Sequence, residues 1–281
     1  MTTTTAHTTK PAFLGWNSQD LVMRYYHNSD MQLQWAISAF SKFGKLSGDE
    51  QILDYGSGDG KISALISNFV PRGSLTAVDL SHHMSEFASN FYDQGSYPNL
   101  SFHVLNDPNF DTWDGPHDFD LATSFCMLHL AQQPQKILKN ICRRLKPNGH
   151  FVATWPIGLT EEATRDLIGV AKDHGISIPL PENERLLMQK AESIPKMLNS
   201  AGFDVESCNV VMTHNPFLNK QELVDWYIGT LSANWDVPVE KRAAFFHDLA
   251  DKHISLEQHK WTSGLVYQDF PRIDIIAKPK K

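Results

Sequence analysis

The sequence predicts an α/β protein built on a doubly wound, mostly parallel sheet. Short apolar strands alternate with amphipathic helices from about residue 50 to residue 156, and a glycine-rich turn joins the first strand to the first helix. In sheets of this kind, ligands bind at the carboxyl ends of the strands. The residues directly after each strand are therefore the first candidates for a site.

The first strand ends at Ile52–Tyr55, and Gly56, Gly58 and Gly60 follow at alternate positions. Residues without a Cβ take such a turn easily and let the backbone approach a ligand closely. Apolar residues then recur at helical spacing, namely Ile62, Leu65, Ile66, Phe69 and Val70. Strand, glycine loop and helix together predict a nucleotide site.

The spacing of the glycines separates two kinds of nucleotide site. A dinucleotide fingerprint needs a glycine three residues after its second one, and Lys61 stands there. The pattern Asp54-x-Gly-x-Gly-x-Gly instead resembles the first motif of class I S-adenosylmethionine (AdoMet) methyltransferases. In that family the loop packs against the methionyl part of the cofactor, and the leading acid helps to hold its ammonium group. The resemblance thus implies AdoMet contacts for Asp54 and for Gly56, Ser57, Gly58 and Gly60.

A second strand, Ser74–Leu80, ends in the carboxylate of Asp79. A carboxylate offers two acceptor oxygens in one plane, so Asp79 is suited to accept both ribose hydroxyls. We assign its neighbour Leu80 to the same site. Ser81 is expected to cap the following helix, which reaches Phe91.

The third and fourth strands, Leu100–Leu105 and Phe119–Phe125, also end in candidate residues. Members of the family commonly place an acid after the third strand against the adenine amino group, which makes Asn106 and Asp107 candidates. We assign Phe125 to the cofactor site. His129 follows at the expected mouth of the site.

A helix leads from Ile137 to the turn Leu145–Gly149, which also resembles the methyltransferase family, and a fifth strand follows at Phe151–Trp155. The cofactor core is thus expected over residues 49–156, in a single Rossmann-like domain over residues 13–281 with a seven-stranded sheet. The Thr-rich residues 1–12 are expected to form a disordered tail without the apolar core of a signal peptide.

The flanking regions are expected to select the substrate. Residues 13–48 indicate an N-terminal helical segment, and residues 157–263 a helical cap with strand six at Val205–Met212. Residues 264–281 hold the final strand, bent at Pro271. The cap helices are expected at about Glu161–His174, Glu184–Ser200, Leu218–Leu231 and Val239–Leu256. A cap rich in aromatic residues and poor in charge favours a small, partly apolar substrate, although most such aromatics are ordinary core residues.

A narrower resemblance concerns three short segments. Tyr25–Gln32 resembles the N-terminal segment of juvenile-hormone-acid methyltransferases, in which a glutamine holds the substrate carboxylate; Gln32 would be its counterpart. The segments Glu222–Thr230 and Phe270–Ala277 resemble trans-aconitate methyltransferases, which also methylate carboxyl groups. This chain departs from the hormone-acid type after His129, where Leu130 replaces a frequent tryptophan and removes an indole N–H donor.

Three functions remain open at this point. A carboxylate nucleophile is ionised at neutral pH and needs no base, so Gln32 and His129 would only orient it. A phenol or amine would benefit from a base, and His129 is then the candidate, unless it is simply a packed histidine. The chain is also consistent with a catalytically silent AdoMet-binding regulatory subunit.

Composition adds limits. The formal charge of −7 and the lack of basic clusters argue against nucleic-acid binding, and no apolar run is long enough to span a membrane. Three cysteines in apolar runs are typical of reduced thiols in a cytoplasmic protein. The adjacent His82 and His83 indicate a solvated pair rather than a metal site. The sequence does not indicate an oligomeric state.

Overall fold

The computed structural model describes residues 16, 18–44, 46–157, 161–178, 186–232, 235, 237–257 and 265–280, so the predicted tail lies outside them. Its seven-stranded sheet has the order β3-β2-β1-β4-β5-β7-β6. The five parallel strands are β1 (Gln51–Tyr55), β2 (Ser74–Asp79), β3 (Leu100–Val104), β4 (Phe119–Phe125) and β5 (Leu145–Pro156); β6 (Phe203–Phe217) and β7 (Val266–Pro279) pair antiparallel. The predicted α/β, Rossmann-like and mostly parallel sheet is confirmed.

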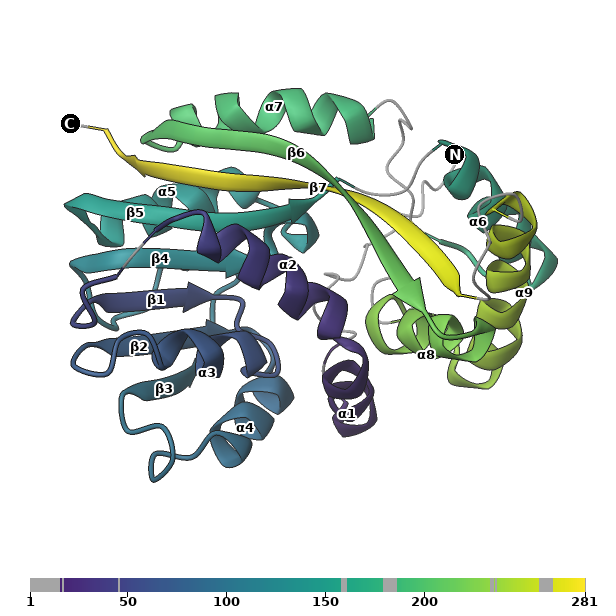
Figure 1. Cartoon of the computed structure of the whole chain (residues 1–281), viewed down its shortest axis with the longest axis horizontal. Helices are drawn as coiled ribbons and strands as arrows, with labels where there is room; N and C mark the ends of the chain where they lie inside the picture. Colours follow the sequence, from purple (N-terminus) through teal and green to yellow (C-terminus); the bar gives the residue numbers. More distant parts are fainter. Residues whose placement is uncertain are drawn as a thin grey trace, which may run out of the picture.

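Helices cover both faces of the sheet (Figure 1). On one face lie α2 (Asp30–Ser41), α3 (Lys61–Ser67) and α4 (His82–Phe91), and on the other α5 (Pro134–Arg144) and α7 (Leu186–Ser200). Side chains alternate along β1, so that Ile52 packs beneath α2 and α3 whereas Leu53 and Tyr55 pack beneath α5. Ser81 caps α4 as predicted, because its Oγ accepts a hydrogen bond from Met84 N–H at 3.2 Å.

The cap has a hydrophobic core of its own. It contains α6 (Glu161–Asp173), α8 (Lys220–Thr230) and α9 (Val239–Glu257), and α1 (Gln19–Asn28) packs against α8. Figure 1 shows β6 and β7 running out of the sheet toward α8 and α9, where Phe217 and Val266 join the cap core. The ends of the long antiparallel pair therefore connect the cap to the sheet.

Three elements differ from the sequence-based expectation. Strand β5 begins at Leu145, within the segment expected as a turn, because Leu145 already pairs with Phe119 of β4. Strand β6 continues past Met212 to Phe217, because its outer residues remain paired with β7 on the way to the cap core. Helix α7 was expected in the cap, but it packs against β6 and α5, with Ile194 and Leu198 buried in the core of the sheet.

Among the described helices, none is both long enough and apolar enough to cross a membrane. Cys126, Cys142 and Cys208 are free thiols.

Candidate active site

A cavity lies at the carboxyl ends of β1 and β4. These strands are neighbours in the sheet, and the chain order reverses between them, which is the usual ligand position in doubly wound folds. The cavity contains about 1390 Å³ of empty space, including the part open to solvent at its mouth. The glycine loop, the ends of β2 and β3 and the segment after β4 line it, together with residues of α1, α2, α8 and β7.

The three loop glycines have different neighbours. A Cβ on Gly56 would lie 2.3 Å from Met127 Cγ, and one on Gly60 would lie 2.8 Å from atoms of Ala88 and Phe102. At Gly58, where φ is +55°, a Cβ would border the cavity with only Tyr25 within 4 Å, at 3.8 Å. Gly56 and Gly58 both line the cavity, but of the three loop glycines only Gly58 has open space where a Cβ would lie, whereas Gly56 and Gly60 permit close packing.

Asp79 lines the cavity beside Gly58. Its Oδ2 accepts a hydrogen bond from Gly58 N–H at 2.9 Å, and its Oδ1 accepts one from Ser81 N–H at 2.8 Å. Burial raises the pKa of Asp79, and these hydrogen bonds oppose the rise by favouring the carboxylate. Each oxygen keeps a further lone pair, so the pair of acceptors fits the two hydroxyls of a ribose. The neighbouring Leu80 and, from β4, Phe125 also line the cavity.

Asp54 lies beneath the loop and not on the cavity wall. Its Oδ2 accepts a hydrogen bond from Ser63 Oγ at 2.5 Å and its Oδ1 one from Thr123 Oγ1 at 2.8 Å. Burial raises its pKa to about 6. Asp54 thus connects the end of β1 to α3 and β4. Because it does not line the cavity, the structure does not support the direct contact with the cofactor ammonium group that the resemblance implied. Ser57 is also off the wall; its buried Oγ has no hydrogen-bond partner in the described part of the chain.

The two candidates after β3 are not on the cavity wall either. Asn106 is exposed, while Asp107 accepts backbone hydrogen bonds from Asn109 (2.9 Å), Asp111 (2.6 Å) and Thr112 (3.1 Å). Because Asp107 folds this loop, it is Leu105, Pro108 and Asn109 that reach the cavity. The adenine contact of Asn106 and Asp107 stays a prediction. Of the polar residues in this loop, Asn109 is the one that lines the cavity.

The predicted substrate residues Gln32 and His129 both line the cavity. Gln32 is 9% exposed, and its Oε1 has no hydrogen-bond partner among the described residues. Tyr25 lines the cavity from α1 and packs edge-on against Trp16, with ring centroids 5.1 Å apart. Burial, together with the nearby acidic groups, raises the pKa of Tyr25 well above its usual range, so its phenol remains a hydrogen-bond donor at neutral pH.

A polar cluster joins the glycine loop to the N-terminal helices. Lys61 Nζ donates to Tyr26 O (2.7 Å), Ser29 Oγ (3.1 Å) and Asp30 Oδ1 (2.9 Å). The buried Asp59 accepts from Ser29 Oγ at 3.0 Å. Sequence reasoning missed this connection, although Asp59 and Lys61 lie inside the motif and Ser29 and Asp30 inside the N-terminal segment that it singled out.

The far wall of the cavity is aromatic. Phe270 of β7 packs between Trp35 of α2 and Trp226 of α8, with centroid distances of 6.1 and 5.4 Å. Sequence reasoning assigned none of these three residues to the site, because aromatic residues at such positions are most often ordinary core. The only signal was that Trp226 and Phe270 lie in segments that resemble other methyltransferases.

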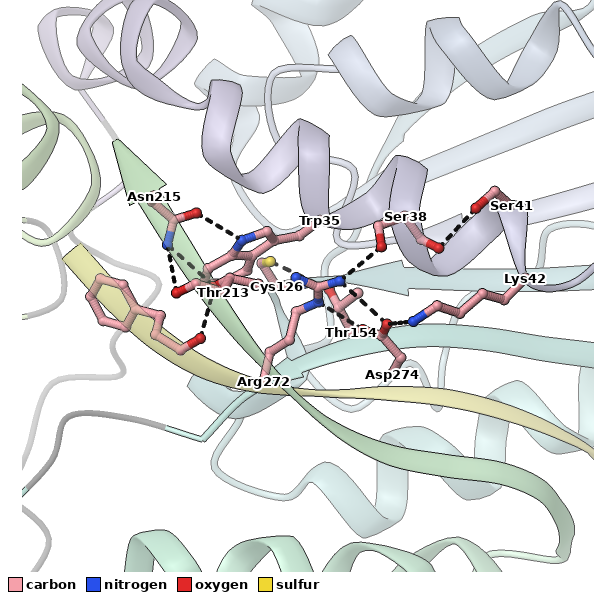
Figure 2. Close-up of polar contacts among 11 residues, drawn as sticks. Trp35, Ser38, Ser41, Lys42, Cys126, Thr154, Thr213, Asn215, Arg272 and Asp274 are labelled. Carbon is pink, nitrogen blue, oxygen red and sulfur yellow. Dashed lines mark hydrogen bonds and ion pairs between the residues drawn. The ribbon is translucent and has the colours of Figure 1, made fainter. Parts of the chain in front are cut away.

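Figure 2 shows the polar contacts of Trp35 and of the neighbouring Arg272. Its Nε1–H donates to Asn215 Oδ1 at 3.3 Å, and the Arg272 guanidinium lies 5.5 Å from its ring centroid. Arg272 is buried and donates to Asp274 Oδ1 at 2.7 Å, and Lys42 Nζ lies 2.6 Å from Asp274 Oδ2. The Arg272 charge is therefore paired within the protein, and Arg272 does not line the cavity.

The two adjacent histidines approach each other more closely than expected. One ligand atom each from His82, His83 and Glu86 lie within 4.8 Å of one another on the surface of α4, although none of the three lines the cavity.

Comparisons with known proteins agree with this geometry. Residues 46–174 match a family model described as a methyltransferase domain. The chain is 23% identical over 234 residues to a trans-aconitate 2-methyltransferase of Klebsiella pneumoniae, covering 82% of this chain and 86% of the relative. The YcgJ protein of Bacillus subtilis has a similar fold, with a TM-score of 0.57 and 16% identity over 88% of this chain and 100% of that one. A phosphoethanolamine N-methyltransferase of Haemonchus contortus, solved with S-adenosylhomocysteine, gives a TM-score of 0.52 and 14% identity over 88% of this chain and 53% of that one.

Proposed function

We propose that this chain, which is a class I AdoMet-dependent methyltransferase, methylates a carboxylate oxygen of a small carboxylic acid. The feature that supports the proposal most is the Gln32 amide at the cavity wall, because its Nε2–H groups can donate hydrogen bonds to a carboxylate oxygen. The carboxyl-methylating relative supports the same chemistry. We also place the protein in the cytoplasm, in keeping with its three free thiols.

Cofactor and substrate are assigned to different residues of the cavity wall. AdoMet, when bound, supplies an electrophilic methyl group on a sulfonium. Asp79 would accept the ribose hydroxyls, and the backbone at Gly58 would border the cofactor where the space for a Cβ is open. The Gln32 amide N–H groups and the hydroxyl of Tyr25, which lies beside Gly58, would hold the acid so that one oxygen points along the line of displacement. His129 would help to order this pocket.

Little acid–base chemistry is required of the protein in this reaction. The carboxylate is ionised at neutral pH and supplies the electron pair of the new ester bond. Burial raises the pKa of Cys126, which also lines the cavity, to about 11, so that group stays a neutral thiol, as Tyr25 stays a neutral phenol. Among the described wall residues, the His129 imidazole is then the candidate base for a phenol or amine substrate.

A methyl-transfer assay against carboxylic acids, phenols and amines tests the proposal. We expect esters from acids, and activity that persists to mildly acid pH. Gln32→Ala should lower turnover while the dissociation constant of AdoMet changes little, and Gln34→Ala, an exposed position on the same helix, should leave both unchanged. Acids refused and phenols or amines accepted, with a rate that collapses below a pKa near seven, would replace this proposal by a base-assisted O- or N-methyltransferase.

A further inference from the structure

The loop between β3 and β4 forms the part of the cavity wall beside Asp79. Residues 105–118 contain no helix or strand, and three of them, Leu105, Pro108 and Asn109, line the cavity. Leu105 N–H donates to the backbone oxygen of Asp79 at 2.7 Å, so the loop begins next to the residue that we assign to the ribose. The loop is therefore placed to contact the base that is attached to that ribose.

Asn140 of α5 holds the backbone of this loop. Its buried side-chain Nδ2 donates to the backbone oxygen of Asn109 at 2.9 Å and to Asp111 Oδ1 at 2.8 Å, and its Oδ1 accepts from Arg143 at 3.4 Å. The N–H of Asn109 in turn donates to Asp107 Oδ1 at 2.9 Å. Both backbone polar groups of Asn109 are thus bonded inside the protein, so its side-chain amide is the group left to bind a ligand.

Arg144 holds the second half of the loop from one turn further along α5. This buried guanidinium donates to three backbone oxygens, those of Trp113, Gly115 and Pro116. Its Cζ also lies 4.5 Å from the ring centroid of Phe110 and 4.7 Å from that of Trp113. Because a lysine offers a compact point charge in place of this planar fork of donors, the arrangement requires arginine.

Phe110 connects the contacts of Arg144 to the cavity wall. Its φ of +63° is a left-handed conformation that side chains rarely adopt, so surrounding contacts must hold it. Its ring is 1% exposed and packs against Trp113 and Tyr55, with centroid distances of 4.9 and 5.1 Å. Tyr55 lines the cavity, and its hydroxyl donates to the backbone oxygen of Pro108 at 3.2 Å. A continuous set of contacts therefore leads from α5 to the wall.

We infer that Asn140 and Arg144 are positioning residues for the nucleoside end of AdoMet, because they fix the loop in the conformation that places Pro108 and Asn109 on the wall against which the adenine binds. Neither Asn140 nor Arg144 lines the cavity, so each acts through the loop. The inference concerns the cofactor and holds for any methyl acceptor. It therefore goes beyond the proposed carboxyl methylation and does not depend on it.

Calorimetry with two ligands tests the assignment. S-adenosylhomocysteine carries the adenine, whereas S-ribosylhomocysteine keeps the ribose and the amino acid without it. Asn140→Leu removes both donors at similar side-chain volume. We expect the dissociation constant of S-adenosylhomocysteine to rise about tenfold or more, and that of S-ribosylhomocysteine to change less than about threefold. Cys142→Ala is the matched control, because Cys142 lies on the same helix but donates to Gly202 O, just before β6, and should leave both affinities unchanged.

A second variant and a second measurement keep the test decisive if Asn140→Leu does not fold. Arg144→Lys keeps the charge but loses the planar fork, so it should also weaken the binding of S-adenosylhomocysteine selectively. Without ligand, hydrogen exchange in residues 105–118 should be faster in either variant than in the wild type, whereas exchange in β2 should be unchanged. Equal weakening of the two ligands, an unchanged affinity for S-adenosylhomocysteine, or unchanged exchange of the loop would each overturn the inference.

Discussion

Replacing Asp79 by alanine removes the acceptor that we assign to the cofactor ribose. In the structure each carboxylate oxygen accepts one backbone hydrogen bond, from Gly58 or from Ser81, and has one lone pair left for a hydroxyl. A hydrogen bond to a charged group contributes about 1.5–3 kcal/mol, so losing two weakens binding by at least about 3 kcal/mol. At about 1.4 kcal/mol per tenfold change, this corresponds to an increase of roughly 150-fold in the dissociation constant of S-adenosylhomocysteine.

The alanine variant also leaves the backbone N–H groups of Gly58 and Ser81 without their acceptor, which would disturb the loop even if no ribose contact existed. A double-perturbation cycle separates the two effects. Calorimetry is performed on the wild type and on Asp79→Ala, each with S-adenosylhomocysteine and with its 2′-deoxy analogue. The analogue should bind more weakly than the parent to the wild type and about equally to the variant. An equal loss in both proteins would show that Asp79 does not bind the 2′-hydroxyl.

Three further predictions concern the loop and the core. Gly58→Val should abolish AdoMet binding, because its Cβ would enter the cavity at a φ of +55°, and calorimetry that finds normal affinity would contradict the loop geometry. The raised pKa of Asp54 makes the folded state bind a proton more tightly than the unfolded one. The stability that this gives is full below pH 4 and is lost as pH rises through about 6. In urea unfolding, the free energy of unfolding of the wild type relative to Asp54→Asn should thus fall by about 2–3 kcal/mol between pH 4 and pH 7.5. A difference that stays constant with pH would refute this prediction. Asp274→Ala should destabilise the fold by about 3–5 kcal/mol, since Arg272 is left charged and buried, and the double variant with Arg272→Met should recover part of that loss.

The sequence predicted the sheet well because its signals are local. A run of apolar residues, a glycine turn and a capping serine each depend on neighbours in the chain, and Ser81 is an example in which the expected bond is present. The boundaries of β6 were predicted less well. Its outer half is stabilised by pairing with β7 and by the cap core, and neither partner is near it in sequence.

The predicted site residues also divide into those whose position follows from the local sequence and those whose orientation depends on the folded structure. Five predicted cofactor residues reach the cavity because they lie at the ends of strands or shortly after them, namely Gly56, Gly58, Asp79, Leu80 and Phe125. The resemblance to other methyltransferases does not specify the orientation of each side chain. Asp107 satisfies backbone groups of its own loop, so the neighbouring Asn109 reaches the wall in its place.

Polar contacts connect the glycine loop to the N-terminal helices that line the cavity. Lys61 and Asp59 of the loop bind Ser29 and its neighbours at the junction of α1 and α2. Those two helices carry Tyr25 and Gln32, which face the cavity. A ligand that orders the loop should therefore also order these two helices, since directional hydrogen bonds and an ion pair connect them to the loop. Cofactor and substrate positions are thus coupled through residues of the motif that touch neither ligand in the proposed arrangement.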